Sequence, residues 1–191
     1  MAILDAKFTN PKEGGPSFSL GHRLSRLLWN VCWTTLGIWT PTPMFAWRRI
    51  LLRSFGANVS SKAKVYPFVR IWYPRNLTMQ DYSCLARGFN CYCVDHIQLG
   101  TYALVSQNAF LCGGTHDVDD VHFQLMTKPI VIGADAWVAA EAFVGPGVVI
   151  GHSAVLGARA VVFKNLEPHT IYAGNPAIAL RRRKQNEAEN G

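Results

Sequence analysis

The segment CGGTHDVDD, residues 112–120, places one histidine between a pair of glycines and a run of aspartates. An imidazole can take up and return a proton near neutral pH, so His116 is a candidate general base, and the alternative is an ordinary loop histidine. One of Asp117, Asp119 and Asp120 can orient the ring, although a backbone carbonyl would serve equally. Because the segment interrupts a regular pattern, we expect a loop on a rigid scaffold, where chemistry is commonly placed.

That regular pattern is a six-residue repeat between Ile132 and Val161, which matches neither the helical nor the strand period. Large apolar residues recur at every sixth position, and they are Ile132, Val138, Val144, Ile150 and Leu156. Three six-residue sides form a triangular coil, and stacked coils form a parallel β-helix with the large residues inside. The glycine or alanine after each large residue is expected at a corner, where it avoids crowding and permits an unusual φ.

The repeat extends toward the N-terminus and divides the chain. Earlier members are Val59, Val65, Ile71 and Leu77, and Leu99 and Val105 continue the repeat after a slip of two residues. A polar stretch at 111–131 interrupts it and contains His116, so this stretch is the predicted catalytic loop. We therefore expect an arm with apolar helices at 1–54, a β-helix domain at 55–183 and a polar tail at 184–191.

The first 54 residues combine a polar arm, which is predicted to be loose, with two apolar helical segments. Residues 21–40 are apolar almost all round, but their uninterrupted part is shorter than the roughly 20 residues of a spanning helix. Either the helices pack on the β-helix and close the open strand edge of its first coil, or residues 21–55 contact an acidic membrane peripherally. The second interpretation puts these side chains at headgroup depth: Trp29, Trp33, Trp39, Trp47, Arg48, Arg49 and Arg53.

The net charge limits the kinds of partner that this protein is expected to bind. A formal net charge of +7 favours an anionic partner. No nucleic-acid recognition motif accompanies this charge, and the aromatic residues cluster in the apolar N-terminal segment, so nucleic acid is not an expected partner.

Five cysteines without a secretory signal indicate reduced thiols in the cytoplasm. The segment Cys91-Tyr92-Cys93 lacks a second pair at a zinc-finger spacing, so no metal is expected.

The repeats IGADAW, VAAEAF, VGPGVV, IGHSAV and LGARAV resemble those of the left-handed β-helix acyltransferases. YAGNPA is similar to the family's exit from the helix, and GGTHD to its catalytic loop. RLLW, PTPMFAWRRILLRSFGA and VRIWYPRNLTMQDYSCLARGFNCY resemble the colanic-acid-biosynthesis branch of exopolysaccharide O-acetyltransferases. The resemblance implies a left-handed parallel β-helix with N-terminal helices and a short C-terminal tail or helix. It also implies a homotrimer that binds acetyl-CoA in a groove between two subunits.

The resemblance also assigns roles to residues of the donor site. Ala140 and Ala158 would offer backbone groups to the pantetheine arm, and the amide of Ala140 could also stabilise the oxyanion. Trp137 would line the wall near the thioester. Lys164 and Arg181 would meet the phosphates at the nucleotide end, which suits a charged donor.

The acceptor contacts are predicted from the coil before the loop and from the loop itself. Asn90, Asp95 and Asp117 are the expected saccharide contacts, and the alternative is that Asn90 and Asp95 are polar turn residues at a corner of the coil. A zinc-hydratase site of the type found in related trimeric β-helices is disfavoured, because the spacing of His116 and His122 does not match it.

These observations predict an acetyl-CoA-dependent O-acetyltransferase that acts on a saccharide hydroxyl in exopolysaccharide or surface glycan biosynthesis. The predicted location is the cytoplasm, or the inner face of the membrane if the helices bind lipid. Acetylation of an amino sugar or an amino acid is the close alternative, since a fold does not set the substrate. A non-catalytic trimeric scaffold is the alternative from another class, and His116 together with the basic C-terminus argues against it.

Overall fold

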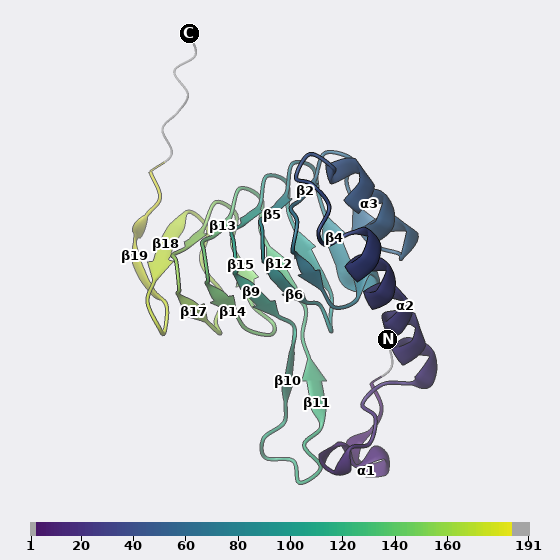
Figure 1. Ribbon diagram of the computed structural model, residues 1–191. Coiled ribbons are helices and arrows are strands. Elements are labelled where there is room, and N and C mark those ends of the chain that lie inside the picture. The colour runs from purple at the N-terminus through teal and green to yellow at the C-terminus, as the bar shows by residue number, and fades with distance from the viewer. Residues whose placement is uncertain (1–2, 185–191) are drawn as a thin grey trace.

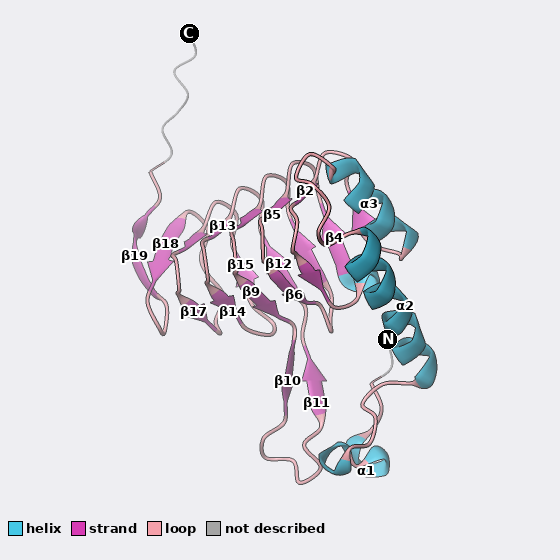
Figure 2. Ribbon diagram, viewed as in Figure 1, coloured by secondary structure: helices cyan, strands magenta, loops and turns pink. Residues whose placement is uncertain are grey.

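The structure, a computed structural model, describes residues 3–184 of the 191-residue chain. A prism of stacked parallel strands forms the body, the two longer helices lie at one end, and a two-stranded hairpin projects from one edge, with the short N-terminal helix beside its tip (Figure 1). Helix is concentrated in the N-terminal part of the chain, before the first strand (Figure 2). The helices are α1 (Ala6–Thr9), η1 (Pro11–Glu13), α2 (Leu20–Leu36), α3 (Phe45–Ser54) and η2 (Pro74–Asn76).

Three sheets form the sides of the prism, and their strands follow one another in rotation along the chain. The first sheet contains β1 (Asn58–Val59), β4 (Leu77–Met79), β7 (Ile97–Leu99), β12 (Ile130–Ile132) and β15 (Val149–Ile150). The second contains β2 (Lys64–Val65), β5 (Cys84–Leu85), β8 (Leu104–Val105), β13 (Trp137–Val138), β16 (Val155–Leu156), β18 (Thr170–Ala173) and β19 (Ile178–Arg182). The third contains β3 (Arg70–Ile71), β6 (Asn90–Tyr92), β9 (Phe110–Cys112), β14 (Phe143–Val144) and β17 (Val161–Val162). The predicted parallel β-helix is confirmed.

The strand register shows that the turns differ in length. Val131 pairs with Val149, eighteen residues later, as a strict hexapeptide repeat requires. In the first turns the partner lies twenty residues later, since Val59 pairs with Met79. The prediction that Leu77 continues the series from Val59 is therefore wrong in register. Both Leu77 and Met79 are buried, which explains why the apolar pattern alone did not separate them.

The small residue after each large one is explained by packing and not by an unusual φ, so that part of the prediction is wrong. Positive φ falls three residues after each large residue, at Asp135, Glu141, Gly147, Ser153 and Arg159. The small residues instead stack against the next coil. A Cβ on Gly133 would lie 2.6 Å from the backbone nitrogen of His152, and one on Gly151 would lie 2.6 Å from that of Pro168. A side chain at Gly133 or Gly151 would push neighbouring coils apart.

The helices cover the open strand edge of the first coil, as the packing interpretation predicted. Trp29 Nε1 donates to the carbonyl of Ile71 at 2.7 Å, and Trp33 Nε1 donates to that of Val69 at 2.9 Å. Both indole rings are buried, with exposed fractions of 1% and 4%. The alternative that placed these two tryptophans at headgroup depth is therefore wrong. They satisfy carbonyls that would otherwise lack a donor in the apolar interior.

α3 supplies further donors to the same edge. The bonds run from Arg48 Nε to the carbonyl of Val65 (2.6 Å), from Arg49 Nη1 to that of Ala63 (2.9 Å) and from Arg53 Nε to that of Val59 (2.7 Å). The Arg48 side chain is fully buried, so it is not available to a membrane surface. Within residues 3–184 no helix has the length and hydropathy needed to cross a membrane.

The described chain ends in the strand β19, just before the predicted tail or helix. The turn at Gly174–Pro176 reverses the chain, and β19 then pairs antiparallel with β18. β18 pairs with β16 along one edge, and β19 pairs with its other edge, so the backbone groups of both edges have partners. Residues 185–191, which make up most of the predicted polar tail, lie outside the described residues.

Candidate active site

The segment that carries His116 is a hairpin that leaves the prism at one corner. β10 (Gly114–His116) and β11 (Leu125–Thr127) pair antiparallel, with His116 opposite Leu125. The chain leaves the third sheet at β9 and re-enters the first sheet at β12, so the hairpin projects from the edge between these sheets (Figure 1). The hairpin is therefore held at both ends by stacked coils.

The His116 ring is oriented by a backbone carbonyl within this hairpin. Its Nδ1 lies 2.9 Å from the carbonyl oxygen of Phe123, and the two rings stack with centroids 4.3 Å apart. A carbonyl oxygen only accepts hydrogen bonds, so in the neutral ring Nδ1 carries the proton. Nε2 is then left with its lone pair. This is the tautomer that a general base requires.

The aspartates of the loop shape the backbone and do not orient the ring. Asp117 accepts a hydrogen bond from the amide of Asp119 at 3.1 Å. Asp120 accepts from the amides of His122 and Gln124, both at 3.0 Å. These two amide hydrogen bonds, with that of His122 first, stabilise the ionised carboxylate and lower the pKa of Asp120. Of the two orienting groups that the sequence left open, the carbonyl is the one observed.

The N-terminal arm braces the hairpin, so the prediction that the arm is loose is wrong. The amide of Ala6 donates to Gln124 Oε1 at 2.6 Å, and Gln124 Nε2 donates to the carbonyl of Leu4 at 3.3 Å. Lys12 Nζ donates to the carbonyl of Val121 at 2.7 Å. These contacts join residues more than a hundred positions apart, so no local sequence pattern indicates them.

Three of the predicted donor-site residues meet in a groove on the second sheet. The groove has a volume of about 590 Å³ and contains Trp137, Ala140 and Ala158. Trp137 Nε1 donates to Ser106 Oγ at 2.8 Å, which fixes the indole on the wall. The other lining residues are Ser106, Gln107, Ala139, Val155, Gly157, Ile171 and Arg183. The wall is mostly apolar and lined by small side chains, with one cation.

The cation in the groove is Arg183, which the sequence analysis did not single out. Its Nη1 donates to the carbonyl of Asp135 at 2.9 Å and to that of Ser153 at 3.3 Å. Arg181, which was predicted for this role, is exposed on β19 and does not line the groove. Lys164 is also exposed and follows β17 at the corner from which the hairpin projects. The structure therefore does not bring either cation into the groove of the same chain.

The predicted acceptor residues lie in two places. Asn90 is on β6 and lines a cavity of about 330 Å³ between α2 and the third sheet, together with Trp72 and Tyr92. Asp95 lies in the turn after β6, where its Oδ1 accepts from the amide of His96 at 2.6 Å. That turn occupies the same corner as the hairpin, one coil earlier. Asp95 is thus on the same edge as the base, whereas Asn90 is on the sheet face.

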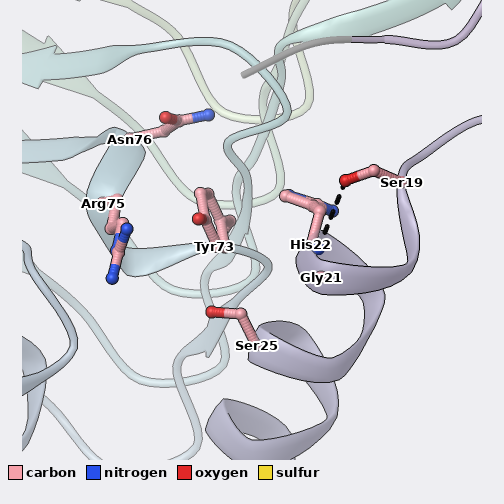
Figure 3. Close-up of a pocket in the computed structure, with 7 residues that line it drawn as sticks. All are labelled: Ser19, Gly21, His22, Ser25, Tyr73, Arg75 and Asn76. Atoms are coloured by element: carbon pink, nitrogen blue, oxygen red, sulfur yellow. Dashed lines mark hydrogen bonds between the residues drawn. The ribbon is translucent and has the colours of Figure 1, made fainter.

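A further cavity at the first turn of α2 contains none of the predicted site residues. It has a volume of about 540 Å³, and Figure 3 shows its lining by Ser19, Gly21, His22, Ser25, Tyr73, Arg75 and Asn76. His22 is 8% exposed, and neither ring nitrogen has a hydrogen-bond partner within the described residues. Burial, followed by the nearby Arg26, lowers the pKa of His22, so this ring is neutral at pH 7.

Within one chain the base and the groove lie on different sides of the prism. The hairpin leaves the edge between the third and first sheets, and the groove lies on the second sheet. In a triangular prism that edge is opposite the face of the second sheet. A single chain therefore does not place His116 against its own groove.

Solved structures of acetyltransferases share this fold. A maltose O-acetyltransferase from Clostridium difficile 630 superposes with a TM-score of 0.78 at 22% identity, over 87% of this chain and 90% of that one. A hexapeptide-repeat acetyltransferase, VCA0836 of Vibrio cholerae O1 biovar eltor in complex with acetyl coenzyme A, gives 0.76 at 23%, over 90% and 93%. No family model matches the chain.

A curated protein of Escherichia coli strain K12 is 38% identical over 180 residues, which span 94% of this chain and 97% of that protein. With the observed fold, this likeness shows that the chain belongs to the hexapeptide-repeat acetyltransferases. The Escherichia coli protein is described as "Putative colanic acid biosynthesis acetyltransferase WcaF". A protein of Shigella flexneri with the same description matches over the same length at the same identity.

Proposed function

We propose that this protein transfers the acetyl group of acetyl-CoA to a saccharide hydroxyl in exopolysaccharide biosynthesis, with His116 as the general base. The observation that carries the proposal is the hydrogen bond between His116 Nδ1 and the carbonyl of Phe123, which leaves Nε2 able to accept a proton. The description of the Escherichia coli relative supports the pathway, and those of the solved structures support a sugar hydroxyl and acetyl-CoA.

The groove fits the donor in shape and chemistry. Its alanines and glycine leave room for the narrow pantetheine arm, and Trp137 offers a flat apolar wall. The amides of Ala140 and Ala158 donate no hydrogen bond to any residue between 3 and 184, so both are available to the donor. Arg183 supplies a positive charge for the phosphates, and Lys164 and Arg181 remain proposed phosphate contacts. Bound acetyl-CoA would supply the thioester that is cleaved.

The proposed reaction is direct transfer. Nε2 of His116 accepts the proton of the acceptor hydroxyl while its oxygen bonds to the thioester carbonyl carbon. The amide of Ala140 donates to the oxygen on which negative charge develops. The carbon–sulfur bond then breaks, the proton passes to the thiolate, and the products are an acetyl ester and free coenzyme A. Asp95, on the same edge as the base, and Asn90 and Asp117 are the proposed acceptor contacts.

The proposal predicts a saccharide-dependent release of thiol and an ester product. With acetyl-CoA alone, thiol release should be slow, and it should rise when repeat units of an exopolysaccharide or their precursors are added. Because esters are cleaved by mild alkali and amides are not, the transferred acetate should be released at high pH. An alkali-stable product would show that the acceptor is an amine and not a hydroxyl. Thiol release that no saccharide stimulates would contradict the proposal.

We further propose that the active unit is a homotrimer with the active site between subunits. His116 and the groove lie on opposite sides of one prism, so the hairpin of one subunit must meet the groove of the next. A cyclic arrangement of three prisms repeats this contact three times and closes it. The exposed Lys164 lies on the same edge as the hairpin, so it would enter the neighbouring groove as well.

A shared site predicts complementation between two inactive variants. His116→Ala removes the base, and Ala158→Trp should fill the groove without disturbing the core because Ala158 is exposed. Each variant alone should be nearly inactive. Co-expressed in equal amounts with two different tags, they should recover about a quarter of the sites, since hairpin and groove assort independently in a cyclic trimer.

The control is co-expression of His116→Ala with itself under the same two tags, which should stay inactive. If doubly tagged assemblies of the two variants are isolated and show no activity above that control, base and groove belong to one chain. Sedimentation of an active monomer would contradict the trimer itself.

A further inference from the structure

α2 presents an apolar face that nothing in the described chain covers. Five of its side chains are between 53% and 66% exposed, and we call them the α2 stripe: Leu20, Leu24, Leu27, Leu28 and Val31. At the rotation of about 100° per residue of an α-helix, these positions fall within one sector of roughly 100°. The buried residues His22, Trp29 and Trp33 lie on the opposite side of the same helix. α2 is therefore apolar on both faces.

The fold itself fixes the outward direction of the stripe. The indoles of Trp29 and Trp33 are hydrogen-bonded to carbonyls of the first coil, so the helix cannot rotate to bury its other face. A contiguous apolar patch that a fold holds open marks an interaction surface more often than a packing defect. The stripe lies at the end of the prism opposite to the C-terminal strands (Figure 1).

The charge of the surrounding segment selects the partner. Residues 14–80 contain nine arginines and lysines and no aspartate or glutamate. Among them, these side chains are exposed and have no carboxylate partner within the described residues: Arg23, Arg53, Lys64, Arg70 and Arg75. An apolar stripe in a segment that has basic but no acidic side chains is complementary to a surface that offers both acyl chains and negative headgroups.

One flank of the stripe carries a cation, and the other adjoins a polar cavity that a cation lines. By helical rotation Arg23 is next to Leu27 on one flank, and Gly21 and Ser25 are next to Leu28 on the other. Gly21 and Ser25 line the polar cavity of Figure 3, to which Arg75 contributes and which contains no acidic side chain. Headgroup phosphates beside a helix that lies flat on a bilayer would meet cationic or polar groups on each side.

We propose that α2 docks the protein on an anionic lipid surface, with the α2 stripe in the headgroup region and the helix axis parallel to the bilayer. The helix lies on the membrane and does not cross it, in agreement with its 17 residues. In the proposed trimer three stripes would bind together, which converts weak individual contacts into stable attachment. The docking does not depend on the proposed acetyl transfer, and its test requires neither substrate nor donor.

Flotation of the full-length protein with vesicles tests the proposal. The protein should rise with vesicles of phosphatidylcholine and phosphatidylglycerol at low salt and remain below with phosphatidylcholine alone. Salt should weaken the binding, because part of the attraction is screened charge. The double substitution Leu24→Gln and Leu28→Gln should lower the bound fraction at least about tenfold, since it removes apolar area from the face that would enter the headgroup region. Arg23→Glu should lower it as well, and this variant changes no buried residue.

The matched control is Ile178→Gln with Leu180→Gln, which removes two equally exposed apolar side chains from β19 at the other end of the molecule. It should float like the unsubstituted protein. Circular dichroism should show that all variants keep their fold, since every substituted residue is exposed. Equal flotation of the α2 variant, or a failure of the unsubstituted protein to float, overturns the proposal. A change in sedimenting mass on α2 substitution also overturns it, because a second copy of the chain would then cover the stripe.

Discussion

Replacing His116 by alanine should lower the turnover number by about 10²–10⁴-fold, the usual loss when a general base is removed. The affinity for acetyl-CoA should change little, because the groove with Trp137, Ala140 and Ala158 is on the second sheet and His116 is in the hairpin. Steady-state rates with a working saccharide acceptor, together with a direct binding measurement for acetyl-CoA, separate the two effects.

His122→Ala is the matched control, since His122 lies in the same hairpin and its ring makes no hydrogen bond within the described residues. Its turnover should stay close to that of the unsubstituted protein. Phe123→Ala keeps the carbonyl that holds His116 and removes only the stacked ring, so it should cost less than loss of the base. Near-normal turnover of His116→Ala would disprove the proposed mechanism.

Arg48→Met should destabilise the protein by several kcal/mol, because each buried carbonyl that is left without a donor costs about 1–3 kcal/mol. Arg48 is fully buried, and its Nη1 donates to the carbonyl and the hydroxyl of Thr40 at 3.1 and 2.8 Å. Its Nη2 donates to the carbonyl of Thr42 at 2.6 Å, and its Nε to that of Val65. Methionine fills similar space but leaves these carbonyls without a donor. Urea unfolding followed by circular dichroism, at one fixed protein concentration, measures the difference.

Arg53→Met provides the comparison. Arg53 also donates to a carbonyl of the first coil, but it is exposed and makes one such bond, so its loss should cost about 1 kcal/mol or less. Arg48→Lys should fall between the two, because an ammonium group cannot reach the same set of acceptors as the guanidinium fork. Equal stability of Arg48→Met and Arg53→Met would show that the buried network does not hold the helices to the first coil.

The positions of Arg48 and Arg183 could not be predicted from the sequence. A basic run beside tryptophans has the pattern of a membrane-facing surface, yet Arg48 is buried because the first coil leaves strand carbonyls without donors. Arg181 and Arg183 are indistinguishable by composition, and the pairing of β19 with β18 is what brings Arg183 into the groove. Ser106 was missed for a related reason. It occupies the position of Ala139 one coil earlier, but the hairpin separates the two by 33 positions and hides the equivalence.

The sequence by itself determined the β-helix and the interruption that holds His116, and the family resemblance indicated Trp137, Ala140 and Ala158 of the groove. The β-helix and its interruption follow from a repeat in which each position makes the same contact in every coil, so spacing along the chain translates directly into position. Only the tertiary structure decided that Phe123 orients His116, that base and groove lie on opposite sides of one prism, and that α2 keeps the stripe from Leu20 to Val31 exposed. Such features depend on contacts between distant segments, and a local pattern carries no information about which distant residue fills the space beside it.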